Sequence, residues 1–363
     1  MTITETYYWL NNITGVGAVK VRAMSEYFGT VAGIYNIEGR ELENLGILRG
    51  REIDAWEECR KNKEKILEGY HSMKEKGIRF ITVEDEEYPE RLKPLYDRPF
   101  ALFVKGRILQ DGRPSAAIVG ARKCSYYGRE TAQRIARELS RAGVQIVSGL
   151  AYGIDGCGHK GALDAGGDTY GVLGCGVDIC YPLQNWEMYL KMQVKGGVIS
   201  EFAPGTKPLA AHFPMRNRII SGLSDAVIVV EAKEHSGSLI TVDQALEQGK
   251  QVFALPGRIS DTLSQGCNRL IKEGAEVLTD VKDVLEFFHL EGSEPGKNGA
   301  SGKIGLAINE EKVYSGLDLQ PKHLEEISQL CGLSIHETAA VLLKLELDGL
   351  IAQPVKNYYA LRG

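Results

Sequence analysis

The sequence predicts an α/β protein whose centre is a Rossmann-like, doubly wound and mostly parallel sheet, flanked by a helical N-terminal domain and a C-terminal winged helix. Six short apolar segments alternate with helix-periodic segments between residues 116 and 273. Near-continuous apolar strands separated by helices are typical of a parallel sheet covered on both faces. A stretch rich in Gly, Ser and charge then precedes the last sixty or so residues. The expected parts are a helical domain (1–77), the Rossmann-like domain (78–289), a linker (290–303) and the winged helix (304–363).

The N-terminal part reads as short helices separated by glycines. The turn Thr14-Gly-Val-Gly17 lies between two helical stretches, and a charged helix follows over 61–77. A glycine turn between two helices is the form of a helix-hairpin-helix, in which backbone amides can face a DNA phosphate. The same glycines would also serve as ordinary helix caps in a small, SAM-like bundle. Both interpretations stay open.

The central part shows regular alternation after two strands expected at 78–83 and 101–104. The strands expected next are 116–119, 145–148, 169–173, 197–200, 226–230 and 251–254. The helices expected between and after them are 129–142, 156–165, 185–195, 216–223, 238–248 and 268–273.

The C-terminal part opens its main helix with Ser334, three residues before Glu337, which is the spacing of a capping box. Helix, turn, helix and a closing hairpin predict a winged-helix domain. The buried face of this helix is expected to carry Leu333, Ala340, Leu343 and Leu347. The same helix has Lys344 as its basic residue against Glu337, Glu346 and Asp348. This charge is unfavourable for DNA, so the module is expected to meet protein or only to pack.

The formal charge of −5 and the pI near 5.9 argue against a protein that coats nucleic acid through bulk charge, and leave room for a local basic patch. The seven cysteines are scattered and form no Cys-x-x-Cys pair, so a disulfide framework or a metal site is not expected. The sequence shows neither a signal peptide nor an apolar run long enough to span a bilayer. We therefore expect a cytoplasmic protein without a membrane segment.

The ligand site of an open parallel sheet lies outside the carboxyl ends of its strands. Gly120, Arg122 and Lys123 follow one expected strand, and Ser148-Gly149 ends the next. Glycine there lets backbone amides approach a ligand, and the N-terminus of the following helix favours negative charge. Two fixed cations in the first loop favour a polyanion.

A second basic segment spans residues 202–224, which contain no carboxylate. Its candidate binding residues are Lys207, Phe213, Arg216, Asn217 and Arg218. Clustered cations with an interleaved aromatic suit single-stranded nucleic acid, because phosphates need charge and unstacked bases need a flat apolar partner. The alternative is that Phe213 belongs to the core and the arginines are a solvated helix start.

Two other functions are weaker. The Gly120 loop lacks Gly-x-Gly-x-x-Gly, and the next strand ends in Ser148-Gly149 where an acidic ribose partner would stand, so a dinucleotide cofactor is disfavoured. A nucleotide-processing enzyme could use Glu201 or Glu231 with His159. No recognisable nucleophile, acid–base pair or metal-ligand spacing supports it, so no catalytic residue, metal or cofactor is expected.

The motifs resemble the DNA-processing protein A (DprA/Smf) family over about residues 80–285. They are Ala117-Ile-Val-Gly-Ala-Arg122, Tyr127-Gly128, Ser148-Gly-Leu-Ala-Tyr-Gly-Ile-Asp155, His159, Val172-Leu-Gly-Cys-Gly-Val-Asp178, Tyr181-Pro182, Phe213-Pro-Met-Arg-Asn-Arg-Ile-Ile220, Gly222-Leu-Ser224, Glu231-Ala232, Ser236-Gly237 and Ala254-Leu-Pro-Gly257. The string from Phe213 to Ser224 is the most specific of them.

The resemblance implies a non-enzymatic protein that binds single-stranded DNA and helps load the RecA recombinase during natural transformation. It also implies a homodimer through the Rossmann-like domain, with single-strand-binding protein as a further partner. The DNA contacts implied are Arg122, Lys207, Phe213, Arg216, Arg218 and the backbone around Ser148-Gly149. One departure is Tyr152, which stands where a basic residue is common in the family.

Overall fold

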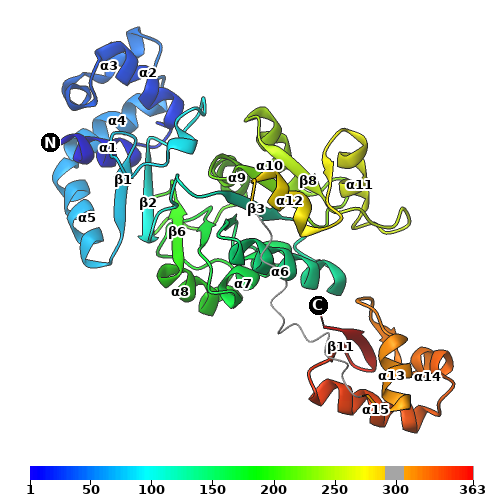
Figure 1. Cartoon of the computed structure of the whole chain (residues 1–363). Coiled ribbons are helices and arrows are strands. Elements are labelled where there is room, and N and C mark those ends of the chain that lie inside the picture. The colour runs from blue at the N-terminus through cyan, green and yellow to red at the C-terminus, as the bar shows by residue number, and fades with distance from the viewer. Residues whose placement is uncertain (291–305, 363) are drawn as a thin grey trace.

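The computed structural model describes residues 1–290 and 306–362 (Figure 1). All but the first residue of the expected linker, 290–303, lies outside the described residues. The described chain contains a nine-stranded sheet with helices around it, a helical N-terminal region, and a C-terminal unit with its own three-stranded sheet. This is the predicted α/β class with a mostly parallel sheet.

The N-terminal region is built from short helices around two tryptophans. Its elements are α1 (Ile3–Asn11), α2 (Ala18–Phe28), a 3-10 helix η1 (Val31–Asn36), α3 (Gly39–Asn44), α4 (Arg51–Lys61) and α5 (Lys63–Glu75). Trp9 and Trp56 are fully buried and meet edge to face, with ring centroids 4.8 Å apart. Phe100 and Ala101 belong to the same apolar cluster, so this region packs on the start of the sheet.

The glycine turn before α2 is engaged within the chain. Gly15 has a φ of +85°, a conformation that glycine adopts without strain. Lys20 Nζ donates to Gly15 O at 3.1 Å and pairs with Glu52, whose side chain lies against the turn. A carboxylate here repels phosphate, which weakens the interpretation of the turn as a DNA-binding hairpin.

The sheet has the strand order β1-β2-β6-β5-β4-β3-β7-β8-β9. Its strands are β1 (Arg79–Thr82), β2 (Ala101–Gly106), β3 (Ser115–Val119), β4 (Gln145–Ser148), β5 (Thr169–Val172), β6 (Gly196–Ser200), β7 (Ala226–Val229), β8 (Gln251–Ala254) and β9 (Glu276–Val277). All pairs from β6 to β9 are parallel, whereas β1 and β2 are antiparallel. From β3 the chain winds outward to β6 on one side, then returns to β7 on the other. The crossover point therefore lies between β3 and β7.

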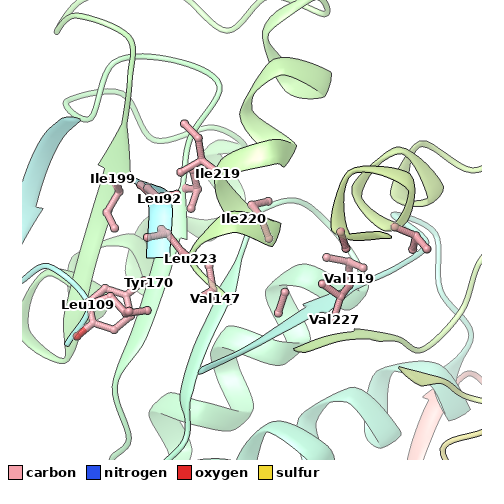
Figure 2. Packing of buried hydrophobic residues seen from close by; sticks show 14 of the residues in the cluster. Leu92, Leu109, Val119, Val147, Tyr170, Ile199, Ile219, Ile220, Leu223 and Val227 are labelled. Carbon is pink, nitrogen blue, oxygen red and sulfur yellow. The ribbon is translucent and has the colours of Figure 1, made fainter. Parts of the chain in front are cut away.

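Side chains of β3 alternate between the two faces of the sheet, because successive residues of a strand point in opposite directions. Val119 packs in the cluster that contains Ile219 and Ile220 of α9 (Figure 2), and Ala117 belongs to the same cluster. Ala116 and Ile118 pack in the cluster built from α6, α7 and α12. The helices are α6 (Tyr126–Arg141), α7 (Ile154–Asp164), α8 (Trp186–Val194), α9 (His212–Gly222), α10 (Gly237–Glu247), α11 (Gln265–Lys272) and α12 (Val281–Phe287). Short 3-10 turns, η2 (Glu90–Leu92) and η3 (Leu183–Asn185), complete the region.

Helix α9 begins at His212, four residues before the start expected from sequence. The expected start, residue 216, lies two residues beyond Pro214. In the structure Pro214 sits in the first turn of α9, where a missing N–H costs little because those amides have no partner within the helix. Phe213 and Arg216 therefore share one helix, and this decides the shape of the site.

The C-terminal unit contains α13 (Ile308–Ser315), β10 (Lys322–His323), α14 (Leu324–Cys331), α15 (Ile335–Leu347), β11 (Ile351–Val355) and β12 (Tyr358–Leu361). The capping box at the start of α15 is confirmed, because Ser334 Oγ accepts from Glu337 N at 3.3 Å and Glu337 accepts from Ser334 N at 3.0 Å. The buried face expected for this helix was wrong for Ala340, Leu343 and Leu347, which are exposed, whereas Leu333 packs against the core as expected. Leu342 and Leu345 are fully buried, whereas Leu343 and Leu347 are 58% and 79% exposed. The face of α15 that carries Leu342 packs against α13 and α14, and the face that carries Leu343 and Leu347 is exposed to solvent.

No helix in residues 1–290 and 306–362 has the length and apolar character needed to cross a bilayer.

Candidate nucleic-acid interface

A pocket of about 790 Å³ lies at the crossover point of the sheet. It is lined by segments that follow β3, β4, β5, β6, β7 and β8, so almost every parallel strand contributes at its carboxyl end. Open α/β sheets bind ligands at this position. Its charged and aromatic lining residues are Arg122, Lys123, Asp155, Tyr181, Phe213, Arg216, Lys233 and His235.

The loop after β3 is held close to the end of β7. Ala121 N donates to Glu231 O at 2.7 Å, and a Cβ on Gly120 would lie 2.8 Å from the same oxygen. A side chain at Gly120 would therefore push the two loops apart. Arg122 and Lys123, which follow directly, are exposed on the pocket wall. The structure thus places the two predicted cations at the pocket. The close contact between Gly120 and the backbone of Glu231 sets their position.

The N-terminus of α6 is filled by a carboxylate of the protein itself. Glu231 accepts from Ser125 N at 2.9 Å and from Ser125 Oγ at 2.5 Å. A Cβ on Gly128 would lie 2.3 Å from the Glu231 side chain, so the helix and the carboxylate are in close contact. Burial raises the pKa of Glu231, and the Ser125 hydrogen bonds oppose this. Because Glu231 already takes the helix N-terminus, a phosphate in the pocket has to be held by other groups.

One face of α9 forms a wall of the pocket. Phe213, Arg216, Asn217 and Ile220 all line it, and their spacing of three and four residues puts them on one side of a helix. Arg218 does not share this face and is absent from the lining. The basic residues predicted from sequence therefore lie on two faces of α9. Arg216 is on the face that lines the pocket, and Arg218 is on a face that is buried in the protein.

Two aromatic rings and a guanidinium stand together at the pocket. The Arg122 guanidinium lies 5.5 Å from the centre of the Phe213 ring. Tyr181 stacks on Phe213 with centroids 5.7 Å apart and planes 24° apart, and Tyr181 is 46% exposed. A cation beside flat, partly exposed rings is the combination that holds a phosphate and an adjacent unstacked base.

Arg216 lies at the floor of the pocket and is only 4% exposed. Its Nη1 donates to Gly149 O at 2.7 Å and also to Val172 O, while its buried Nε has no hydrogen-bond partner. Burial lowers the pKa of Arg216 to about 10, which still leaves it charged at neutral pH. Asp155 is buried nearby and accepts from Gly149 N at 3.1 Å; burial raises its pKa, and Arg216 opposes that rise. A buried guanidinium whose Nε has no hydrogen-bond partner favours the binding of an anion in the pocket.

Ser148 and Gly149 lie at the end of β4 and contact residues that support the pocket. Ser148 is fully buried and its Oγ donates to Ile118 O at 2.6 Å. The amide of Gly149 donates to Asp155 and its carbonyl accepts from Arg216. A Cβ on Gly149 would lie 2.6 Å from the Arg216 guanidinium, so glycine is required for the arginine to reach its place. Gly149 therefore acts on the pocket through Arg216 and Asp155, whereas Ser148 ties the end of β4 to β3.

Arg218 and Lys207 lie outside the pocket lining. The Arg218 side chain is 9% exposed and pairs with Glu201 at 2.5 Å and with Asp97 at 3.0 Å. Burial raises the pKa of Glu201, while Arg218 lowers it. Lys207 is exposed, next to the lining residue Pro208. Lys207 can therefore meet a strand that leaves the pocket, whereas Arg218 is a buried partner for two carboxylates.

His159 is fully buried and neutral. Its Nε2 accepts from Leu150 N at 3.3 Å, and its Nδ1 lies 2.7 Å from Thr169 Oγ1. Since Thr169 Oγ1 donates to Ile146 O, Nδ1 carries the proton and donates to Thr169. Burial lowers the pKa of His159 to about 3. The three groups of the alternative enzyme thus have separate internal partners, namely Leu150 and Thr169 for His159, Arg218 for Glu201 and Ser125 for Glu231.

The structure adds Lys233 and His235, which sequence reasoning missed, to Ser236 of the Ser236-Gly237 motif. Lys233, His235, Ser236 and Ser238 line the side of the pocket that follows β7. Ser236 caps α10 by accepting from Ser238 N, so the positive end of that helix faces the pocket. The signal was present, because the segment directly follows a predicted strand at the same sheet edge. Within the described residues no group of three or more metal-ligating side chains is found.

Comparison with known proteins agrees with this geometry. A family model described as DNA recombination-mediator protein A matches residues 79–289, which include the whole pocket lining. A second model, the DprA winged helix domain, matches residues 302–354. The chain belongs to the DNA-processing protein A (DprA/Smf) family. The winged helix at its C-terminus is therefore that of the family.

Among relatives of the DprA/Smf family, the DNA processing protein DprA of Bacillus subtilis is 45% identical over 224 residues, 61% of this chain and 74% of that protein. The X-ray structure of DprA from Streptococcus pneumoniae matches with a TM-score of 0.67 and 36% identity, over 79% of this chain and 98% of that one. DprA from Helicobacter pylori matches with a TM-score of 0.53 and 29% identity, over 58% and 96%. The work on the latter concerns its single-stranded DNA binding mode.

Proposed function

We propose that this protein binds single-stranded DNA in the pocket between β3 and β7. The observation that carries the proposal is the wall of the pocket, where Arg122 lies against Phe213 and Phe213 stacks on Tyr181. The Helicobacter pylori relative, with its described single-stranded DNA binding mode, supports the same ligand. One phosphate would lie between Arg122, Lys123 and the buried Arg216, and a base would stack on the exposed aromatic surface.

The strand would continue from the pocket in two directions. On one side it would meet Lys233, His235 and the N-terminus of α10, and on the other the exposed Lys207. Among the residues that line the pocket in the described chain, the one carboxylate is Asp155, which is buried beside Arg216. The surface open to the strand is thus basic although the whole chain carries a formal charge of −5.

Membership of the DprA/Smf family supports a proposal for the cellular role. We propose that the bound strand is handed to the RecA recombinase in the cytoplasm during DNA uptake and recombination, with no catalytic step by this chain. Two copies would act together through the Rossmann-like domain, and single-strand-binding protein would be a further partner. The internal bonding of His159, Glu201 and Glu231 supports binding over turnover.

The test is the affinity for a fluorescent poly-dT oligonucleotide, measured by anisotropy at several salt concentrations. Replacing Arg122 by Ala should weaken binding and lower the slope of log K against log salt by about 0.7, as expected for one lost contact to a single strand. The matched control is Arg134→Ala, which removes an exposed arginine of α6 outside the pocket. Equal affinity of the two variants and the unchanged protein would refute the site.

The partner proposals need their own assay. RecA filament formation on a strand coated with single-strand-binding protein should be faster with the unchanged protein than with Arg122→Ala. Light scattering after size-exclusion chromatography should give the mass of two chains. Normal DNA affinity together with no effect on RecA would separate the binding proposal from the loading proposal and contradict only the second.

A further inference from the structure

Three exposed aromatic rings lie in the segments that lead out of the pocket. Tyr181 lines the pocket, and Ala151, the neighbour of Tyr152, lines it as well. Trp186 follows five residues after Tyr181, at the start of α8. The rings of Tyr152, Tyr181 and Trp186 are 43%, 46% and 47% exposed. Large rings that are open to solvent and grouped beside a binding site indicate a surface that meets a partner.

The two segments that carry these rings are tied to each other. The hydroxyl of Tyr152 donates to Gln184 Oε1. The side-chain amide of Asn185 donates to Leu150 O at 2.9 Å and to Ala151 O at 3.2 Å. These bonds join the loop after β4 to the 3-10 turn η3. The first ring is therefore held beside the segment that carries the other two.

The other two rings are each supported on one side. Tyr181 stacks on Phe213 with ring centroids 5.7 Å apart. Trp186 stacks on Tyr189 with ring centroids 5.4 Å apart and planes 22° apart. Tyr189 is itself fixed, since it is fully buried and its hydroxyl donates to Val177 O at 2.6 Å. A ring that is held on one side and exposed on the other can stack with a base at little cost in conformational entropy.

The segments that carry the rings contain no charged side chain. Residues 149–154 and 181–186 have no Asp, Glu, Lys, Arg or His. The first two charged residues of α8, Glu187 and Lys191, pair with each other at 2.8 Å. The rings can therefore contribute to the binding of a strand through its bases, whereas its phosphates need the cations of the pocket.

The exposed Lys207 lies at the same end of the pocket as the rings. Thr206 O accepts from Gly176 N at 2.9 Å, so the segment that carries Lys207 lies against the segment that leads to Tyr181. A strand that leaves the pocket on this side meets a cation for its phosphates and aromatic rings for its bases.

We propose that Tyr152, Tyr181 and Trp186 form an aromatic track on which the bases of the bound strand stack outside the pocket. This inference rests on the proposed DNA binding and gives it a second contact surface. Every base has a π-face, so the track would lengthen the bound segment without adding a sequence preference. Leu190 and Val194 of α8 are also exposed, which makes a protein the alternative occupant. The flat rings and their continuity with the pocket wall favour the strand.

The first measurement is tryptophan fluorescence, because Trp186 is exposed while the other two tryptophans of the chain, Trp9 and Trp56, are fully buried. Titration with the poly-dT oligonucleotide should quench the emission and saturate together with the anisotropy signal, since a base stacks on the indole. Trp186→Phe keeps a flat ring, so it should retain the affinity and lose the quenching. Binding without quenching, or quenching that persists in Trp186→Phe, would overturn the role of Trp186.

The second measurement is the affinity of Trp186→Leu and of Tyr152→Leu for the same oligonucleotide. Loss of one stacked base should weaken binding between about fivefold and about a hundredfold. The slope of log K against log salt should stay the same, because no charge is removed. The matched control is Tyr27→Leu, which removes a 62% exposed ring from α2 and should leave the affinity unchanged.

The track and the DNA-binding pocket fail in different ways. Equal affinity of Trp186→Leu, Tyr152→Leu and the unchanged chain would overturn the track, leave the pocket proposal standing and assign the exposed face of α8 to a protein partner. An unchanged chain without affinity for single strands would refute the DNA-binding proposal and the track with it.

Discussion

At the scale of single residues, a substitution of Phe213 distinguishes the contribution of base stacking to DNA affinity from the contribution of charge. Its ring contacts both the Arg122 guanidinium and the Tyr181 ring. Phe213→Leu keeps apolar volume but removes the flat surface, so single-strand affinity should fall by about 1–3 kcal/mol. The dependence of affinity on salt should stay the same, because no charge is lost. Anisotropy titrations at several salt concentrations measure both quantities.

The matched control for Phe213 is Phe202→Leu. Phe202 stacks on His212 with ring centroids 4.1 Å apart, but it does not line the pocket. Its replacement should leave the affinity unchanged. An equal loss of affinity in the two variants would mean that the effect comes from the packing of α9, and the proposed stacking role of Phe213 would be wrong.

His159 should make stability depend on pH. Its ordinary pKa is 6.5 and burial lowers it to about 3 in the folded chain, so between these values the unfolded chain binds more protons. Stability contributed by neutral His159 is therefore complete above pH 6.5 and is lost as the pH falls toward 3. The limiting slope for one proton is about 1.4 kcal/mol per pH unit.

The measurement is urea unfolding at a series of pH values for the unchanged chain and for His159→Asn. The difference between the two curves isolates the histidine from Asp155, Glu201 and Glu231, whose raised pKa values act in the opposite direction. Between pH 7 and pH 5 the variant should lose less stability than the unchanged protein. Parallel curves would show that His159 is protonated in the folded state as well.

At the scale of elements, α9 shows what the sequence could predict and what it could not. The basic, carboxylate-free segment was visible, but the shared helix face of Phe213, Arg216 and Asn217 was not, because the expected helix began at residue 216 and left Phe213 outside it. The partners of Arg218 were not visible, because Asp97 and Glu201 come from other segments and meet it only after the sheet has formed. The N-terminus of α6 is a similar case, since its ligand is Glu231, 106 residues away from Ser125.

The buried side of α9 gives a stability prediction. Arg218→Ala would leave Glu201 buried without its cation, which typically costs about 3–5 kcal/mol. The double variant Arg218→Met with Glu201→Met should recover most of this loss, because neither charge is then left alone. Urea unfolding measures both variants. If Arg218→Ala unfolds like the unchanged protein and instead loses affinity for single strands, Arg218 is a DNA contact and not a buried partner.

At the scale of the whole molecule, the rule that parallel sheets bind ligands at their carboxyl edge located the pocket from the sequence. The strands were predicted to within one or two residues because they are short, apolar and bounded by glycine or polar turns. The short β9 and the helix α12 were missed, since a strand of two exposed residues and a helix of seven carry little periodic signal. The buried face of α15 was also predicted incorrectly. This helix has leucines on more than one side, and its packing against α13 and α14 determines which of them are buried.

The exposed face of α15 leads to a prediction about which domain binds DNA. Leu343 and Leu347 are exposed, and Lys344 is paired with Glu310, so this helix offers apolar surface with little free positive charge. We expect DNA to bind in the pocket and not on α15. In the full chain, Leu343→Glu with Leu347→Glu adds two negative charges to the helix that enters the groove in DNA-binding winged helices, and a strand held there would be repelled. The affinity for single strands and its salt dependence should nevertheless equal those of the unchanged protein, measured by the same anisotropy titrations. A severalfold loss that grows as salt is lowered would place α15 on the DNA path and contradict this division.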